Sequence, residues 1–190
     1  MKWLDGYRIR LVLAGVVAAV VLSGGSASAE TIMSEATHVD PPVNGTWGVQ
    51  GCSFSHDGLE LYISCLHPGG YGNRDIWVAT RETVNDPWAE PVNLGSNVNS
   101  SANEAQPAIS PDGLEIYFDN WSDLGGLRLS TRPSKDDPWG APIVLSELGN
   151  AWAPDISADG LSLYFASSRS SGYGSDDIWV ATRETVNDPW

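Results

Sequence analysis

A few tryptophans and acids stand out because their side chains suit binding and because they do not recur elsewhere in the chain. Trp47, Trp121 and Trp152 are unrepeated, and each lies in a loop or at the start of a strand-like segment. An indole in such a place can stack against a sugar ring or a partner side chain. The alternative is an incidental aromatic at the rim of the fold, since single exposed apolar residues are common. We take these three tryptophans as candidate contacts for a ligand or partner.

The segment Asp119–Asp123 (DNWSD) adds two carboxylates, and another pair follows at Asp176 and Asp177. Hard oxygen ligands suit calcium, but the spacing lacks the alternate-residue pattern and distal Glu of a dedicated calcium loop. The alternative is that these acids bond loop backbone. Asp119 and Asp123 join the candidate contacts, and calcium is the one cofactor that the sequence leaves open.

Motifs of catalysis do not emerge from the same reading. The sequence contains no Gly-X-Ser-X-Gly elbow, no His-Glu-X-X-His and no phosphate-binding loop. A sialidase aspartate box needs a residue between its Asp and Gly, whereas Gly113 follows Asp112 directly. His38, His56 and His67 lack the spacing of metal ligands. We therefore predict no catalytic residue.

One unit of about fifty residues is written three times, which is typical of a repeat architecture. The fourteen residues Asp75–Trp88 (DIWVATRETVNDPW) return letter for letter as Asp177–Trp190, 102 positions later. Midway, Gly126–Trp139 keeps the Thr-Arg pair and the final Asp-Pro-Trp. Tryptophans that recur once per unit favour packing between units, and these are Trp77, Trp88, Trp139, Trp179 and Trp190. Arg81, Arg132 and Arg183 are one repeated position, which does not suit the three converging arginines of a sialidase.

Within a unit, the pattern predicts four short antiparallel strands. Ser-X-Asp-Gly at 55–58, 110–113 and 157–160 is a strong hairpin signal between apolar runs, with residues such as His56 in the turn. In the first unit the strands are expected at Cys52–Phe54, Leu59–Ile63, Ile76–Thr80 and Glu90–Leu94. The proline of the last strand suits an outer edge.

The fold is therefore predicted to be all-β, a partial β-propeller of consecutive four-stranded antiparallel blades. The blades span 48–103, 104–150 and an incomplete 151–190, or about 2.75 blades. Such a ring is incomplete, because propellers close with about four to eight blades. We expect either the N-terminal part of a longer protein, whose remaining blades complete the ring, or an open array that must assemble.

Residues 1–29 are typical of a signal peptide. Lys2, Arg8 and Arg10 precede the apolar run Leu11–Leu22, and small residues lead to a cleavage site after Ala29. The run is shorter than the roughly 20 residues of a membrane-spanning helix, although an uncleaved anchor is the alternative. We predict an exported protein, periplasmic or secreted in a bacterium, that does not insert in the membrane after cleavage.

The N-terminal segment 30–47 contains Pro42-Val43-Asn44, which is similar to Pro91-Val92-Asn93 of an outer strand. We expect this segment to supply the closing strand of a final blade.

The net charge of −14 makes nucleic acid an unlikely partner, because an acidic surface repels phosphates. Solubility alone explains such acidity, and binding of cations or a basic partner is the alternative. The compartment permits a disulfide between Cys52 and Cys65. If Cys52 pairs near Tyr62, however, the two cysteines lie too far apart along the strands, so the sequence leaves the bond open.

The run Pro107–Phe118 (PAISPDGLEIYF) and the Gly-X-X-Asp-Ile-Trp-Val runs at 72–78 and 174–180 resemble the TolB-type, WD-like β-propeller repeat. The resemblance covers nearly all of 48–190. It implies an exported bacterial propeller, and the repeat itself carries no catalytic residues. Relatives include a periplasmic partner in the envelope, fusions to peptidoglycan-binding domains and the gating propellers of peptidases.

The leading interpretation is an exported, non-catalytic propeller that binds an envelope protein or polysaccharide through its loops or central channel. The alternative is the N-terminal part of a propeller-type hydrolase, a sialidase-like glycosidase or a peptidase gating domain, whose chemistry lies beyond Trp190.

Overall fold

The computed structural model describes residues 36–121 and 126–190 of this chain. The chain divides into two units, Met1–His38 and Val39–Trp190, and the sheets belong to the second. The proposed signal peptide and Asp123 lie outside the described residues. Within these residues, none forms a helix that is long and apolar enough to cross a bilayer.

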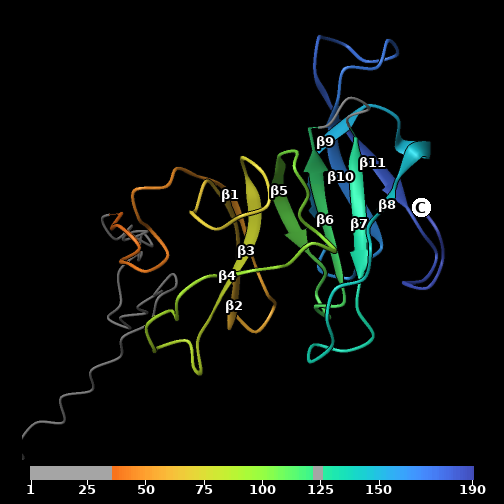
Figure 1. Ribbon diagram of the computed structural model, residues 1–190. Coiled ribbons are helices and arrows are strands. Elements are labelled where there is room, and N and C mark those ends of the chain that lie inside the picture. The colour runs from red at the N-terminus through yellow and green to blue at the C-terminus, as the bar shows by residue number, and fades with distance from the viewer. Residues whose placement is uncertain (1–35, 122–125) are drawn as a thin grey trace, which may run out of the picture. The chain divides into compact units, whose positions relative to one another are not determined.

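Three antiparallel sheets follow one another along the chain and form the blades that the repeat predicts (Figure 1). The first contains β1 (Val49–Phe54), β2 (Glu60–Cys65), β3 (Asp75–Thr80) and β4 (Val92–Asn93). The second contains β5 (Glu104–Ile109), β6 (Glu115–Asn120), β7 (Leu127–Thr131) and β8 (Ile143–Val144). The third contains β9 (Ala151–Ile156), β10 (Ser162–Ser167) and β11 (Asp177–Thr182).

The inner strands β1, β5 and β9 are neighbours of one another, as in a propeller. The sheets have four, four and three strands and do not close into a ring, so the predicted partial propeller is confirmed. A 3-10 turn at Ser146–Leu148 is the one helical element of the described residues.

The prediction of five-residue outer strands was wrong, because β4 and β8 have two residues each. Pro91 and Pro142 directly precede them and lack the N–H that a longer ladder would need. The second strand of the first blade instead runs two residues further than expected, to Cys65.

The Ser-X-Asp-Gly turns are built alike in all three blades. In the first, Ser55 Oγ donates to Asp57 Oδ1 over 2.6 Å, and the Leu59 N–H donates to the same oxygen over 3.0 Å. Gly58 takes a φ of 71°, which favours glycine. The other two turns repeat these bonds at Ser110, Asp112, Leu114, Ser157, Asp159 and Leu161. Each turn therefore fixes where the first two strands of its blade meet.

Apolar side chains from neighbouring blades share two of the hydrophobic cores. Tyr62 and Ile76 of the first blade are buried with Ile116 and Trp139 of the second. Tyr117 and Leu127 of the second blade pack with Leu163 and Phe165 of the third, and Trp190 lies against them. The prediction that recurring tryptophans pack between blades is confirmed for Trp139 and Trp190.

A repeated arginine joins each blade to the one before it. Arg132 Nε donates to the Gly113 carbonyl over 2.8 Å, and its guanidinium lies 4.5 Å from the Trp139 ring centroid. Its Nη2 reaches across to the first blade, donating to Glu60 Oε2 at 3.3 Å and to the Tyr62 hydroxyl at 3.2 Å. We call this set of Arg, Trp, Glu and Tyr the arginine clasp.

The same clasp recurs between the second and third blades. Arg183 holds both Glu115 oxygens, at 3.0 and 2.7 Å, and stacks 4.4 Å from Trp190, whose indole donates to the Tyr117 hydroxyl. Burial raises the pKa of Tyr117 far above its usual range. The hydroxyl therefore stays protonated and donates to Glu115 over 2.7 Å.

The segment before β1 forms turns and bends at residues 41–47 and not a strand. Val43 is buried with Leu61, Ile63 and Trp77. Val43 is 3% exposed, as is Val98 in the second core. Val92, the outer-strand residue that Val43 resembles in sequence, is 65% exposed. The segment thus covers the first blade here, and its pairing with a final blade stays a prediction.

Removing the clasp arginine should cost far more than removing an exposed cross-blade ion pair. The Arg132 and Glu60 side chains are 6% and 18% exposed. Arg132→Ala should lower the free energy of unfolding by roughly 3 kcal/mol, since it leaves the mostly buried Glu60 carboxylate without its cation. Lys135 bonds Asp57 across the same two blades, but these side chains are 44% and 42% exposed. Lys135→Ala should cost less than about 1 kcal/mol in urea titrations, because water screens that pair. Equal losses in the two variants would contradict the clasp's role.

Candidate functional site

Each inner strand carries one extra residue at the same place in its blade. β1 inserts it between Val49 and Cys52, β5 between Ala105 and Ala108, and β9 opposite the step from Tyr164 to Ala166. Such bulges redirect side chains and interrupt the ladder, and they are frequent beside functional sites.

The bulges hold three residues in the left-handed region, with φ of 75° at Gly51, 49° at Gln106 and 52° at Ala153. For Gln106 and Ala153 this conformation costs on the order of 1–3 kcal/mol each. A Cβ on Gly51 would lie 3.0 Å from Gln106 Cα, so the first two bulges touch. Backbone strain repeated on adjacent strands marks this surface as a candidate site.

Together the bulges line an open hollow of about 240 Å³, which we call the axial hollow. Its lining residues are Gln50, Gly51, Cys52, Gln106, Pro107, Ala153 and Pro154. Two amide side chains, one thiol and bulged backbone give it neutral hydrogen-bonding chemistry. No carboxylate or basic group is among these residues.

Asp119 is bonded to one of the residues that line the hollow, Ala153. Its Oδ1 accepts the Ala153 N–H of the third blade at 2.9 Å, which ties the second blade to the left-handed residue. The carboxylate is 1% exposed, and its Oδ2 has no partner among the described residues. Burial raises the pKa of Asp119 from 3.8 to about 7, against the lowering effect of the hydrogen bond from Ala153.

Two of the candidate tryptophans lie near this carboxylate along the strands. Trp121 follows β6 by one residue, is 56% exposed, and donates its backbone N–H to the Asn103 carbonyl over 2.9 Å. Trp152 is half-buried and adjoins Ala153. The predicted contacts Asp119, Trp121 and Trp152 are thus linked through the Asp119–Ala153 bond, while Asp123 lies outside the described residues.

Trp47 is placed differently from the other candidates. Its ring centroid lies 4.2 Å from that of His67, which in turn lies 4.4 Å from Trp77. Trp47 packs against the core of the first blade, and its indole nitrogen is buried without a hydrogen-bond partner among the described residues. Because the Trp47 ring packs against His67 and the core of the first blade, only an edge of the ring could contact a ligand.

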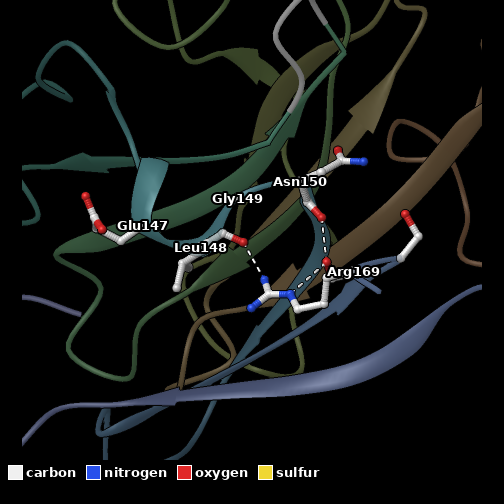
Figure 2. Close-up of a pocket in the computed structure, with 7 residues that line it drawn as sticks. Glu147, Leu148, Gly149, Asn150 and Arg169 are labelled. Atoms are coloured by element: carbon white, nitrogen blue, oxygen red, sulfur yellow. Dashed lines mark hydrogen bonds between the residues drawn. The ribbon is translucent and has the colours of Figure 1, made fainter. Parts of the chain in front are cut away.

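A second hollow, of about 310 Å³, lies at the start of the third blade and contains Arg169 (Figure 2). Its lining residues are Glu147, Leu148, Gly149, Asn150, Ser167, Ser168 and Arg169. The guanidinium donates to the Leu148 carbonyl and to Ser167 Oγ, and it stacks 4.7 Å from the Trp179 ring. Arg169 thus holds two segments of the blade together, and we place the candidate site at the axial hollow.

Two other acids, Asp177 and Glu104, bond the fold itself. Asp177 accepts the Tyr173 and Gly174 N–H groups at 2.9 and 3.2 Å, so it holds loop backbone. Buried Glu104 accepts from Ser100 and Asn120 on the opposite face of the sheet from Asp119. Two carboxylates on opposite faces cannot act on one bond. The described residues bring no three His, Cys, Asp or Glu side chains together as metal ligands.

Sequence reasoning did not find the bulges that form the hollow. Gly, Gln and Ala occupy the three left-handed positions, and no common residue type marks them. An alignment of the three copies upstream of Ser-X-Asp-Gly could have shown that the first strand begins before Cys52, at Val49. Such an alignment would not have revealed the bulge.

No protein-family model matches the chain, and no curated protein matches its sequence. A solved structure described as a putative TolB from Agrobacterium tumefaciens is similar, with 22% identity and a TM-score of 0.49 over 70% of this chain and 42% of that one. TolB from Acinetobacter baumannii has 12% identity and a TM-score of 0.38 over 72% and 41%. The chain spans about two fifths of these proteins, and the fold assignment rests on the blades described above.

Replacing the buried carboxylate should change how stability depends on pH. The pKa of Asp119 is about 7 in the folded protein and ordinarily 3.8. The folded state therefore binds this proton more tightly than the unfolded state does. The stability contributed by the bound proton is complete below about pH 4 and is lost as pH rises through 7. Asp119→Asn should therefore raise the free energy of unfolding at pH 8 by at most about 4 kcal/mol and leave pH 4 nearly unchanged. Asp155→Asn, at an exposed position of β9, is the control and should do neither. An unaltered pH profile for Asp119→Asn would refute the assignment.

The two cysteines should differ in reactivity. Cys52 lies opposite Ile63 and is exposed, Cys65 lies opposite Val49 and is buried, and both thiols are free. Burial raises the pKa of Cys65, which leaves little thiolate. A thiol reagent should thus modify one cysteine rapidly and the second only on unfolding. The Cys52→Ser variant should lose the rapid phase, and a protein that reacts only after reduction would contradict the free thiols.

Proposed function

We propose that this chain is part of an exported, TolB-like β-propeller protein that binds an envelope protein or polysaccharide without catalysis, and that the axial hollow receives the ligand. The proposal includes residues 1–29 as a cleaved signal peptide and a periplasmic or secreted location.

The observation that supports the site best is the repetition of a bulge with left-handed backbone on all three inner strands, two of which place a strained non-glycine residue there. The left-handed residues Gly51, Gln106 and Ala153 interrupt the ladder where the side chains of Gln50 and Gln106 and bulged backbone can bond a ligand. Strain of this kind persists only where the surrounding structure imposes it, and it concentrates at functional surfaces. Here Gln106 lies against Gly51 of the first blade, and Ala153 donates its N–H to Asp119 of the second blade.

Charge and chemistry favour a particular class of ligand. The net charge of −14 disfavours nucleic acid and anionic membranes, and a neutral amide-lined hollow suits peptide groups or sugar hydroxyls and acetamido groups. Exposed Trp121 and half-buried Trp152 supply aromatic surface for either ligand. Calcium at the 119–123 segment belongs to the proposal as an accessory ligand only.

A fluorescent reporter on Cys52 tests the proposal, because this thiol is exposed and lines the hollow. We expect its emission to change in titrations with soluble peptidoglycan fragments or with solubilised envelope proteins, and the two probes distinguish polymer from protein. Gln106→Gly keeps the left-handed backbone while removing the amide side chain, so it should weaken binding about tenfold, or roughly 1.4 kcal/mol. Asn85→Ala, in an exposed turn, is the control. Undiminished affinity in Gln106→Gly, or hydrolysis of sialosides or peptides by the purified chain, would overturn the proposal.

A further inference from the structure

A hollow of about 430 Å³ opens where the outer strand of the first blade meets the second blade, and we call it the junction groove. The first blade contributes the loop that contains Tyr71, strand β4 and the turn that follows β4. The second blade contributes its Pro138-Trp139 turn and the clasp arginine. The junction groove is therefore separate from the axial hollow, which the inner strands line. Its lining includes Tyr71, Val92, Ser96, Asn97, Pro138 and Trp139.

Hydrogen bonds hold the walls of the junction groove in place. Asp75 is 2% exposed. Its carboxylate accepts the Tyr71 N–H at 2.6 Å and an Asn93 side-chain N–H at 2.8 Å, so it fixes both the loop and the end of β4. The Asn97 amide donates to the Trp139 carbonyl over 2.8 Å and ties the turn to the second blade. Walls that are fixed in advance lose less freedom when a ligand binds, which favours affinity.

Aromatic and aliphatic side chains give the junction groove an exposed apolar surface. Tyr71 is 54% exposed and Val92 is 65% exposed, and Pro138 of the second blade is exposed as well. Both blades at this junction have four strands and share a core, so the exposed surface belongs to a complete junction. A sugar ring presents a face of C–H groups that stacks on aromatic and aliphatic side chains of this kind.

Polar groups that the fold does not use also line the junction groove. The Gly95 carbonyl accepts the N–H groups of Val98 and Asn99, at 3.1 and 2.9 Å. Among the residues that the structure describes, the N–H groups of Ser96 and Asn97, the Ser96 hydroxyl and the Asn97 Oδ1 atom have no hydrogen-bond partner. These groups include both donors and acceptors, as the hydroxyls of a saccharide require.

The charge of the junction groove favours an uncharged ligand. The described residues that line it include no carboxylate and one cation, Arg132. This guanidinium already donates to the Gly113 and Lys135 carbonyls and to Glu60, so it is not available to an anion. The net charge of −14 repels anions in addition. A neutral groove on an acidic protein complements a ligand without charge.

An extended peptide is less well matched to the junction groove. A peptide that joins a sheet bonds the row of N–H and C=O groups along an edge strand. Strand β4 has only two residues and follows Pro91, which has no N–H, so it offers a short edge.

The second junction contains an equivalent hollow of about 410 Å³ with different chemistry. Ile143 lies there at the repeat position of Val92, and Glu147 lies at that of Ser96. The loop before β7 is shorter than the loop before β3, and it contributes none of the described residues that line this second hollow. The repeat therefore forms the hollow, and the residues that depart from the repeat make the first one neutral and aromatic.

We propose that the junction groove binds an uncharged saccharide, with the sugar ring against Tyr71 and Val92 and its hydroxyls bonded to Ser96 and Asn97. This site is additional to the axial hollow and does not depend on the function proposed for that hollow.

NMR titrations of the purified chain with uncharged disaccharides test the proposal, and the probes are cellobiose, maltose and N,N′-diacetylchitobiose. We expect at least one of them to bind and to shift the backbone amide signals of Ser96 and Asn97. Tyr71→Ala should weaken this binding about tenfold, because the stacking surface is lost, whereas Tyr71→Phe should retain it. Phe54→Ala is the matched control, since Phe54 is 53% exposed and does not line the groove, and it should leave the affinity unchanged.

The Gln106→Gly variant separates this site from the axial hollow, because it should leave the shifts of the Ser96 and Asn97 signals unchanged. If Gln106→Gly lost disaccharide binding while Tyr71→Ala kept it, the saccharide would occupy the axial hollow and the junction groove would be refuted. Failure of every probe to bind would refute the groove as well. So would a polyproline peptide that binds there more tightly than any of the disaccharides.

Discussion

Apolar residues on both faces of each sheet are the constraint from which the rest of this structure follows. A four-stranded blade cannot cover both faces itself, so it must pack against a neighbour. Hydrophobic packing alone only weakly fixes the orientation of one blade on the next, and the hydrogen bonds of the arginine clasp fix it further. Arg132 binds the Gly113 carbonyl of its own blade and Glu60 of the preceding blade, and Arg183 does the same one blade later. A buried ion pair contributes little net stability against apolar alternatives, but a geometry set by several bonds excludes other rotations of one blade on the next.

The fixed orientation of each blade on its neighbour is consistent with the backbone strain in the inner strands. Gln106 and Ala153 adopt left-handed backbone that neither residue prefers, and each is held by contacts to another blade. Gly51 abuts Gln106, and Asp119 accepts the Ala153 N–H. A loosely packed array would relax these residues into ordinary strand and close the axial hollow. The candidate site therefore depends on contacts between blades, in the manner of a scaffold that holds a rigid binding surface.

The sequence predicted those features that local rules or the repeat determine. The period specified the blades, Asp-Gly marked the turns, and recurrence assigned Trp139 and Trp190 to packing. The recurrence of the arginines was also visible in the sequence. Arg132, however, bonds Glu60, which lies 72 positions away, and no local pattern predicts such a partner.

The sequence did not predict the bulges, because their residue types differ and because tertiary contacts hold Gln106 and Ala153 in the left-handed conformation. The burial of Asp119 was likewise invisible: its counterparts Ser64 and Ala166 carry no charge, so the repeat gave no reason to place an acid inside. Trp47 was unrepeated because it covers the first blade, a task that a preceding blade has elsewhere.

The division between a shared frame and unshared residues bears on how such a surface acquires specificity. The clasps and turns are repeated and therefore cannot distinguish one blade from another. Gln50, Cys52 and Gln106 line the hollow and differ from their counterparts at equivalent inner positions, so they make the hollow asymmetric. A ligand that contacted only the repeated backbone would bind in several registers. Side chains that differ between the three equivalent bulges would favour one register. Under the proposed function, the repeated frame places the bulges, and the few residues that break the repeat select the ligand.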